Sequence, residues 1–401
     1  MLLDLSPLKN NRDYRYLYFG QFISFFGTMM TFVALPYQVF ELTHSTLMVG
    51  LLGVVELVPL LITAFIGGAL ADAMDRRKLL VYSELGLAFG CLLLLANALL
   101  SHPSLWLIYV ISGCLSALNG IHRPSLDAMT PRLVKHEEIQ AAAVLGTFKS
   151  TVGWLAGPAV AGIIIATLGL PFTYVIDLLT FVLSIVAILM IKAMPPLETQ
   201  APPSLKSVLE AVRYAMSRPE LLGTYVVDFF AMVFAMPNAL FPAIALTLNN
   251  TKWLGLLYSS PALGALLITV FSGWTKKIVR HGRAVALAAM GWGISIIVFG
   301  LSLNPWWMLF FLMLAGAADS ISGIFRTTIW NETIPDSIRG RMAGLEMLSY
   351  MSGPLLGNTQ AGFMAGVFGL HQAITIGGTL CVIGVGISVL LLPGFWKYVK
   401  K

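Results

Sequence analysis

Residues 67–78 read GGALADAMDRRK, and this short charged stretch separates two long apolar runs. The runs cover residues 47–66 and 79–100, and each is long enough to cross a lipid bilayer. Charged side chains are costly inside hydrocarbon, so the stretch between the runs is expected at a membrane surface. It ends in three adjacent cations at residues 76–78, and the positive-inside rule assigns such a cluster to the cytoplasmic side.

The composition of the whole chain also indicates a membrane protein. Of its 401 residues, 57% are hydrophobic and only 11% are charged, whereas soluble domains carry about 25% charged residues. A soluble core of this size cannot bury so much apolar surface. The net charge of +6 does not indicate a nucleic-acid partner, because the cations follow the membrane topology. We therefore predict an integral membrane protein whose main surroundings are the lipid bilayer.

Twelve apolar runs of spanning length can be counted along the chain. They lie near residues 16–40, 47–71, 79–100, 105–129, 141–168, 171–191, 221–248, 253–274, 284–303, 306–329, 342–367 and 371–392. With the N-terminus inside, every Lys and Arg except Lys149 and Lys252 falls on the cytoplasmic side, Arg123 and Arg326 included. This predicts an all-α membrane protein with twelve transmembrane helices and both termini cytoplasmic.

The longest connection between the runs divides the chain near its middle. The pairs Pro195-Pro196 and Pro202-Pro203 interrupt any helix there. After them, Ser204 can cap a short amphipathic helix on the cytoplasmic membrane face, and a plain linker is the alternative. We expect six-helix bundles at residues 1–193 and 220–401, joined by a linker at 194–219. The pair Gly157-Pro158 returns as Gly353-Pro354, which favours two pseudo-symmetric bundles.

The charged stretch resembles the loop motif of the major facilitator superfamily of transporters. The motif runs glycine, three residues, aspartate, a cation, any residue, glycine, any residue and two cations. Its positions are filled here by Gly68, Asp72, Arg77 and Lys78, with Arg76 adjacent. Ala73 and Asp75 depart from it, and an acidic residue before the basic pair also occurs in the enterobactin (siderophore) exporter branch. Segments 33–38 (VALPYQ), 130–134 (TPRLV) and 340–345 (GRMAGL) are similar to the same branch.

Residues 153–162, GWLAGPAVAG, resemble the antiporter motif of drug and metabolite exporters. Gly153, Gly157 and Gly162 allow another helix to approach closely, and Pro158 removes a backbone hydrogen bond and bends the helix. In the family this motif favours export. A generic packing helix is the alternative interpretation.

The resemblance also implies a cytoplasmic gate built from the residues around the charged stretch. Asp72 is expected to face the N-terminus of the helix near 342–367, where the helix dipole favours an anion. Arg76 and Arg77 are expected to pair with Asp127, with Arg123 close by. The alternative is that these cations only orient the protein in the membrane.

Three acidic residues lie well inside predicted spans, namely Glu56, Asp228 and Asp319. A carboxylate in low-dielectric surroundings can exchange a proton near neutral pH, as proton-coupled antiport requires. The resemblance favours Asp228 and Asp319, because helices 7 and 10 line the central cavity of the family. The alternative is a structural partner for each, for example Lys149.

Several further residues are candidates to line a substrate cavity: Tyr37, Gln38, Asn119, Lys149, Phe229, Phe230 and Phe325. Lys149 can meet an anionic substrate or neutralise a carboxylate, and both interpretations stay open. Aromatic side chains in membrane helices more often serve packing. The chain has no phosphate-binding glycine-rich loop, and its histidines lack metal-ligand spacing. We therefore predict neither an enzyme nor a cofactor or metal site.

The resulting hypothesis is a monomeric secondary active exporter of the bacterial inner membrane. It would move a siderophore-like small molecule outward by alternating access, in exchange for protons. Efflux of multiple drugs such as macrolides is the alternative substrate class, and a non-transporting sensor or scaffold is the alternative of another kind.

Overall fold

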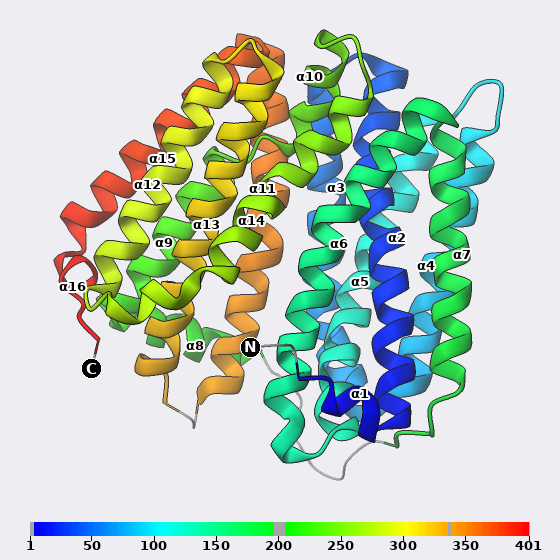
Figure 1. The fold of residues 1–401 in the computed structure, drawn as a ribbon, viewed down its shortest axis with the longest axis horizontal. Helices are drawn as coiled ribbons and strands as arrows, with labels where there is room; N and C mark the ends of the chain where they lie inside the picture. Colours follow the sequence, from blue (N-terminus) through cyan, green and yellow to red (C-terminus); the bar gives the residue numbers. More distant parts are fainter. Residues whose placement is uncertain (1–3, 196–204, 336–337, 401) are drawn as a thin grey trace. The chain divides into compact units, whose positions relative to one another are not determined.

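The computed structural model describes residues 4–195, 205–335 and 338–400, with all their side chains except those of 65, 68, 69, 71–73, 205–208, 340 and 341. These residues form helices joined by short connections, and they contain no strand (Figure 1). The chain divides into two compact units. The first combines Met1–Leu42 with Val55–Pro203, and the second combines Thr43–Val54 with Ser204–Lys401.

The first unit is built around α4, which packs against α5 and α7. Leu17, Leu80, Met129 and Ile188 meet in one of its buried clusters. Its helices are α1 (Ser6–Asn10), α2 (Arg12–Thr43), the larger part of α3 (Thr46–Ala73), α4 (Arg76–Ala98), α5 (Leu105–Leu133), η1 (His136–Glu138), α6 (Ile139–Thr167) and α7 (Leu170–Leu189).

The second unit is built around α12, which packs against α13 and α15, while α9 packs against α14 and α15 (Figure 1). It also includes the first residues of α3. Its other helices are α8 (Leu205–Ser217), α9 (Pro219–Phe234), η2 (Asn238–Leu240), α10 (Phe241–Thr247), α11 (Lys252–Val270), η3 (Ser272–Lys277), α12 (His281–Leu301), α13 (Pro305–Thr333), α14 (Arg339–Phe368), α15 (Leu370–Leu391) and α16 (Pro393–Trp396).

Eleven helical segments in the described part of the chain are long and apolar enough to cross a membrane. They coincide with eleven of the twelve predicted runs. The remaining run forms α14, a helix of 30 residues that is not among the eleven. Asn358, Thr359 and Gln360 stand in a row within α14 and make it more polar than its neighbours. The twelfth span therefore stays a prediction.

The helix predicted near 221–248 is interrupted, although the whole segment is apolar enough to span. Pro237 explains the interruption, because it has no N–H to donate and restricts the residue before it. Side chains from three other helices satisfy the backbone groups around the break. Trp292 donates to the oxygen of Ala235 at 3.1 Å, Tyr258 donates to that of Asn238 at 2.9 Å, and Asn358 accepts from the N–H of Ala239 at 3.2 Å.

The repeated Gly-Pro pairs occupy similar surroundings in the two units. A Cβ atom added to Gly157 of α6 would lie 2.6 Å from the Cβ of Met29 in α2. One added to Gly353 of α14 would lie 3.0 Å from the Cβ of Met232 in α9. In each unit the glycine thus allows a Gly-Pro helix to approach the unit's first long helix.

The first residues of α3 pack closely on α14 within the second unit. A Cβ atom on Gly362 would lie 2.6 Å from the Cα of Gly50, and the Thr46 hydroxyl donates to the oxygen of Gly362 at 3.3 Å. Close crossing of two helices at facing glycines is the usual packing of membrane helices.

The amphipathic helix predicted after residue 204 is present as α8, while its proposed cap, Ser204, lies outside the described residues. Ala211 and Ala215 are buried against the protein, and the Tyr214 hydroxyl donates to the oxygen of Thr333 at 3.1 Å. Leu209 and Met216 remain exposed. An exposed apolar edge is what a helix on a membrane surface requires.

Candidate functional site

A cluster of three charged side chains lies in the second unit. The Arg326 guanidinium of α13 forms an ion pair with Asp228 of α9, and its Nη2 lies 3.7 Å from Oδ1 of Asp319. The side chains of Arg326 and Asp228 are nearly buried, whereas that of Asp319 is 44% exposed. The structure therefore brings together two of the predicted proton-coupling residues through one arginine.

Arg326 is nearly buried within α13, and its predicted cytoplasmic side stays a prediction. Arg326 lies two turns before the end of α13 at Thr333, which is about 10 Å along the axis. Asp319 precedes it by two turns, so both side chains project from one face of α13. That face meets Asp228, because α9 packs against α13. A charged arginine at this depth is tolerated because two carboxylates surround it.

Glu56, the third predicted coupling residue, belongs to the first unit. The Ser112 hydroxyl of α5 donates to its carboxylate, and the Ser116 hydroxyl donates to its backbone oxygen at 2.8 Å. Lys149 forms no ion pair with any described residue. Its role as the partner of an intramembrane carboxylate stays a prediction, since it interacts electrostatically with Glu84.

A further buried carboxylate of the first unit, Glu84 of α4, was not singled out from the sequence. Its side chain has no solvent exposure. Oε1 of Glu84 accepts from Nε2 of Gln21 at 2.6 Å and from the Ser24 hydroxyl at 3.4 Å, and it lies 3.2 Å from Nε2 of His122. This acidic residue is held by two helices besides its own, α2 and α5.

The charged stretch at residues 67–78 is anchored to the first unit by side chains of its own. Asp75 caps the N-terminus of α4, accepting from the N–H groups of Arg77 and Lys78 at 2.9 and 3.3 Å. Arg77 donates to the oxygens of Ile188 and Leu189 at the end of α7, at 3.1 and 2.5 Å. Cations at the C-terminus of a helix interact favourably with its dipole and free carbonyls.

The predicted pairing of Arg77 with Asp127 is wrong. Asp127 instead forms an exposed ion pair with Arg123 at 3.6 Å, one turn away on α5. Arg76 donates to the backbone oxygen of Ala128 at 3.0 Å. Backbone carbonyls of α5 and α7 bind these arginines, and sequence spacing does not reveal such acceptors.

The other two gate residues, Gly68 and Asp72, lie on the described backbone of α3, but their side chains lie outside the described part. The contact of Asp72 with α14 remains a prediction.

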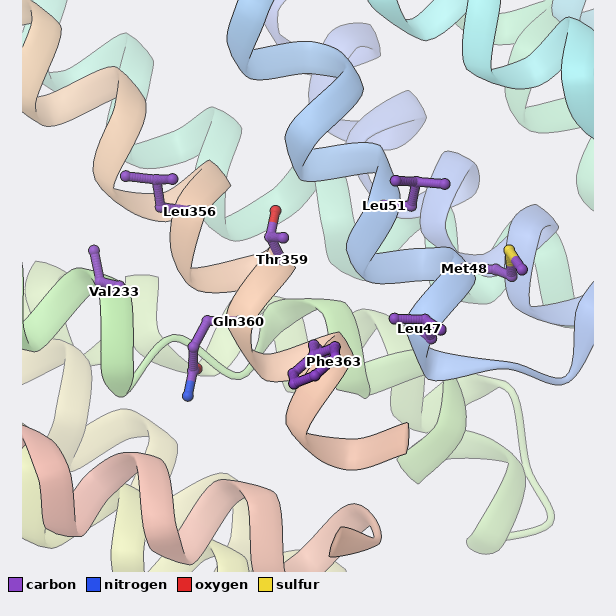
Figure 2. A pocket seen from close by; sticks show the side chains of 8 residues that line it. All are labelled: Leu47, Met48, Leu51, Val233, Leu356, Thr359, Gln360 and Phe363. Atoms are coloured by element: carbon purple, nitrogen blue, oxygen red, sulfur yellow. The ribbon is translucent and has the colours of Figure 1, made fainter. Parts of the chain in front are cut away.

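An apolar pocket of about 520 Å³ lies in the second unit between the start of α3 and α14 (Figure 2). Figure 2 shows the α14 side chains on one side and those of α3 on the other. Its two polar residues are occupied within α14, since the Thr359 hydroxyl donates to Leu355 and the Gln360 amide contacts Met364. The lining residues are Leu47, Met48, Leu51, Val233, Leu356, Thr359, Gln360 and Phe363.

None of the predicted cavity residues lines this pocket. Phe325 is 2% exposed and packs against His281, with ring centroids 5.3 Å apart. Gln38 is equally buried and accepts from the Tyr174 hydroxyl at 2.7 Å. Phe230 stacks on Phe234 at 5.7 Å. These contacts agree with packing for the two aromatic residues, and a place in a substrate cavity stays a prediction for all three.

The remaining cavity candidates are more open. Phe229 is exposed, the Tyr37 hydroxyl donates to Glu41 at 3.4 Å, and the Asn119 amide donates to the oxygen of Leu115 at 3.0 Å.

Close packing explains two glycines of the α6 motif. A side chain at Gly153 would collide with the Phe25 ring, and one at Gly157 would lie 3.0 Å from the backbone oxygen of Phe26. Pro158 and Gly162 are buried in the same helix.

The residues that sequence reasoning missed carried detectable signals. Glu84 is an acidic residue inside the apolar run at 79–100, the same signal that selected Glu56. Arg326 lies seven residues after Asp319, a spacing that places both on one helix face. His122 was grouped with the scattered histidines, and its partner is distant in sequence.

Comparison with known proteins adds a family match. A family model described as "Transmembrane secretion effector" matches residues 3–395. The chain is similar to the Enterobactin exporter EntS of Citrobacter koseri, with 29% identity over 98% of this chain and 94% of that protein. It is also similar to the Enterobactin exporter EntS of Escherichia coli, with 28% identity over the same shares of both chains.

Solved transporter structures share the fold at low sequence identity. A POT family transporter in complex with 5-aminolevulinic acid matches 96% of this chain and 97% of its own, with a TM-score of 0.77 and 12% identity. The nucleoside transporter NupG matches 96% of this chain and 99% of its own, with a TM-score of 0.73 and 14% identity. These likenesses show the fold alone.

Proposed function

The chain belongs to the transmembrane secretion effector family of the major facilitator superfamily, and on that premise we propose that it exports a siderophore-like small molecule in exchange for protons. Family membership makes it a multi-pass transporter of a bacterial inner membrane rather than an enzyme, with a small molecule as its substrate. The proposal adds the substrate class, the proton coupling and alternating access between the two sides of the membrane.

The contact of one arginine with two carboxylates is the observation that carries the proposal. With both carboxylates ionised, Arg326 compensates one of them, and one negative charge remains at a costly depth. A proton on Asp319, the more exposed of the two, makes the cluster neutral. Asp319 is therefore the group that we expect to exchange the proton, while Asp228 holds Arg326 in place.

Competition between substrate and proton at Asp319 supplies the coupling. An ionised carboxylate accepts strong hydrogen bonds from hydroxyl or amine groups of a substrate, and a protonated one accepts weaker bonds. Binding of either ligand thus disfavours the other, and this reciprocity is the thermodynamic requirement for exchange. The proton enters from outside and leaves to the cytoplasm, as the substrate moves outward.

The substrate class rests on the relatives named as enterobactin exporters. The apolar pocket beside α14 favours a second candidate, the efflux of hydrophobic drugs such as macrolides, because its lining offers almost no polar group. An amphipathic molecule has the chemistry that both observations require, because its hydroxyl groups can bind a carboxylate and its apolar part suits an apolar lining.

Uptake into proteoliposomes tests the proposal. The full chain is reconstituted, and an acidic interior is imposed so that outward proton flow drives uptake. Enterobactin and erythromycin serve as probes for the two substrate classes. We expect uptake of enterobactin that collapses when the pH gradient is dissipated, and we expect Asp319→Asn to abolish it. Uptake of erythromycin alone would establish the drug-efflux alternative.

A matched control lies on the same helix as Asp228. Glu220 at the start of α9 pairs only with Arg218 among the described residues, at 3.9 Å, and Glu220→Gln should keep gradient-driven uptake. Loss of coupling in Glu56→Gln, with coupling retained in Asp319→Asn, would move the exchange site to the first unit. Uptake that ignores the gradient in the unmodified protein would refute proton antiport.

A further inference from the structure

Glu84 lies in an asymmetric environment that no part of the proposed exchange at Asp319 explains. Three polar groups converge on Oε1, whereas Oε2 is buried and has no hydrogen-bond partner among the described residues. The two oxygens of a carboxylate are equivalent acceptors, whereas a carboxylic acid has one accepting carbonyl oxygen and one hydroxyl. The surroundings of Glu84 match a carboxylic acid better than a carboxylate, because all the hydrogen-bond donors lie at one of its two oxygens.

His122 gives this buried acid a titratable partner. Its Nε2 lies 3.2 Å from Oε1 of Glu84, and its side chain is 13% exposed where that of Glu84 is fully buried. The imidazole is thus the more open end of the pair. A histidine beside a carboxylate is suited to receive a proton and pass it on, because its protonation equilibrium lies near neutral pH.

The other groups around Glu84 are few and can be named helix by helix. From α2 it meets Gln21 and Ser24, which are uncharged. Lys149 of α6 and Asp177 of α7 interact with it electrostatically. Asp177 differs from Glu84 in that both its oxygens have donors, Thr180 for Oδ1 and Thr31 for Oδ2.

We propose that Glu84 and His122 form a second proton-binding site, located in the first unit. In the loaded state Glu84 holds one additional proton as a carboxylic acid and His122 is a neutral imidazole, so the pair has no net charge. In the unloaded state Glu84 is a carboxylate, and neutral His122 keeps its Nε2–H donated to Oε1. A coupling role for this proton rests on the proposed proton exchange, whereas the site itself does not.

Infrared difference spectroscopy tests the site without any transported substrate. Spectra of the full chain in lipid are recorded between acidic and alkaline pH, and a protonated carboxyl group has a characteristic carbonyl stretch. Glu84→Gln should remove one titrating carboxyl band. His122→Gln should keep that band and shift its midpoint by about one pH unit or more, because Glu84 loses its imidazole partner.

Two further variants serve as controls for the infrared test. Asp177→Asn removes a second buried carboxyl of the same unit and should leave the Glu84 band in place. Glu84→Asp keeps a carboxyl and should keep a titrating band, which covers the case in which Glu84→Gln does not fold. Identical titrating bands in Glu84→Gln and the unmodified protein would overturn the proposal, and so would an unchanged midpoint in His122→Gln. Because no substrate is present, failure of proton-coupled transport leaves this test intact.

Discussion

Gly157 shows how much depends on a single missing side chain in the first unit. A methyl group there would lie 2.6 Å from the Met29 Cβ and 3.0 Å from the backbone oxygen of Phe26, so α2 and α6 would have to separate. We expect Gly157→Ala to destabilise the protein by about 1–3 kcal/mol, the usual cost of overpacking. The unfolding temperature in detergent measures this effect.

A glycine in the same helix provides the control for this substitution. Nothing lies within 4 Å of a Cβ atom added to Gly146, so Gly146→Ala should be neutral or slightly stabilising through helix propensity. Equal destabilisation by both substitutions would mean that the packing between α2 and α6 is not the cause.

At the residue scale, the sequence identified titratable groups but not their partners. Asp228 and Asp319 were selected because a charged side chain inside a membrane span is costly and usually has a function. The arginine that joins them was assigned to the membrane surface, because the positive-inside rule counts cations without knowing their depth. Glu84 meets His122 and Gln21 only through tertiary packing, which no local pattern encodes.

The C-terminal segment that contains α16 contacts two other helices of the second unit, α9 and α13. Phe395 is fully buried against Gly223 of α9, and the Tyr398 hydroxyl that follows donates to Glu332 of α13 at 3.0 Å. We expect Phe395→Ala to cost about 3–5 kcal/mol, because it opens a cavity at this junction. Thermal unfolding in detergent measures the loss.

Val399 is the control for this element, because it is exposed in the same terminal segment. Val399→Ala should change the unfolding temperature little. A Phe395→Ala protein as stable as the unmodified one would show that the C-terminal segment does not hold α9 and α13.

At the scale of elements, apolar runs predicted nearly every long helix but not the shape of each. The segment at 221–248 was taken as one helix, whereas Pro237 interrupts it between α9 and α10. Proline alone does not decide the outcome, since Pro158 and Pro261 lie inside uninterrupted helices. The break forms where Trp292 and Asn358 can satisfy the freed backbone groups, and those contacts come from distant helices.

At the scale of the whole molecule, the two units divide the titratable groups between them. The first contains the buried pair of Glu84 and His122, and the second contains Arg326 with Asp228 and Asp319. The described ion-pair contacts of each set lie within its own unit. A change in the charge of either set can then bias the conformation of the whole transporter, because a proton that binds two states unequally shifts their equilibrium.

The number of membrane crossings can be decided from the positions of the two chain ends. Among the described residues eleven helical segments meet the requirements of a span, and α14 forms the remaining predicted one. An even number of crossings leaves both chain ends on one side of the membrane, and an odd number places them on opposite sides.

Labelling of introduced cysteines tests the number of crossings. A Cys114→Ala background removes the exposed native thiol. In that background, Lys9→Cys and Lys400→Cys should react with an impermeant maleimide only after the membrane is opened. Lys252→Cys should react in intact spheroplasts, because Lys252 is the exposed cation predicted outside. Labelling of Lys400→Cys but not Lys9→Cys in intact spheroplasts would instead mean that α14 does not cross.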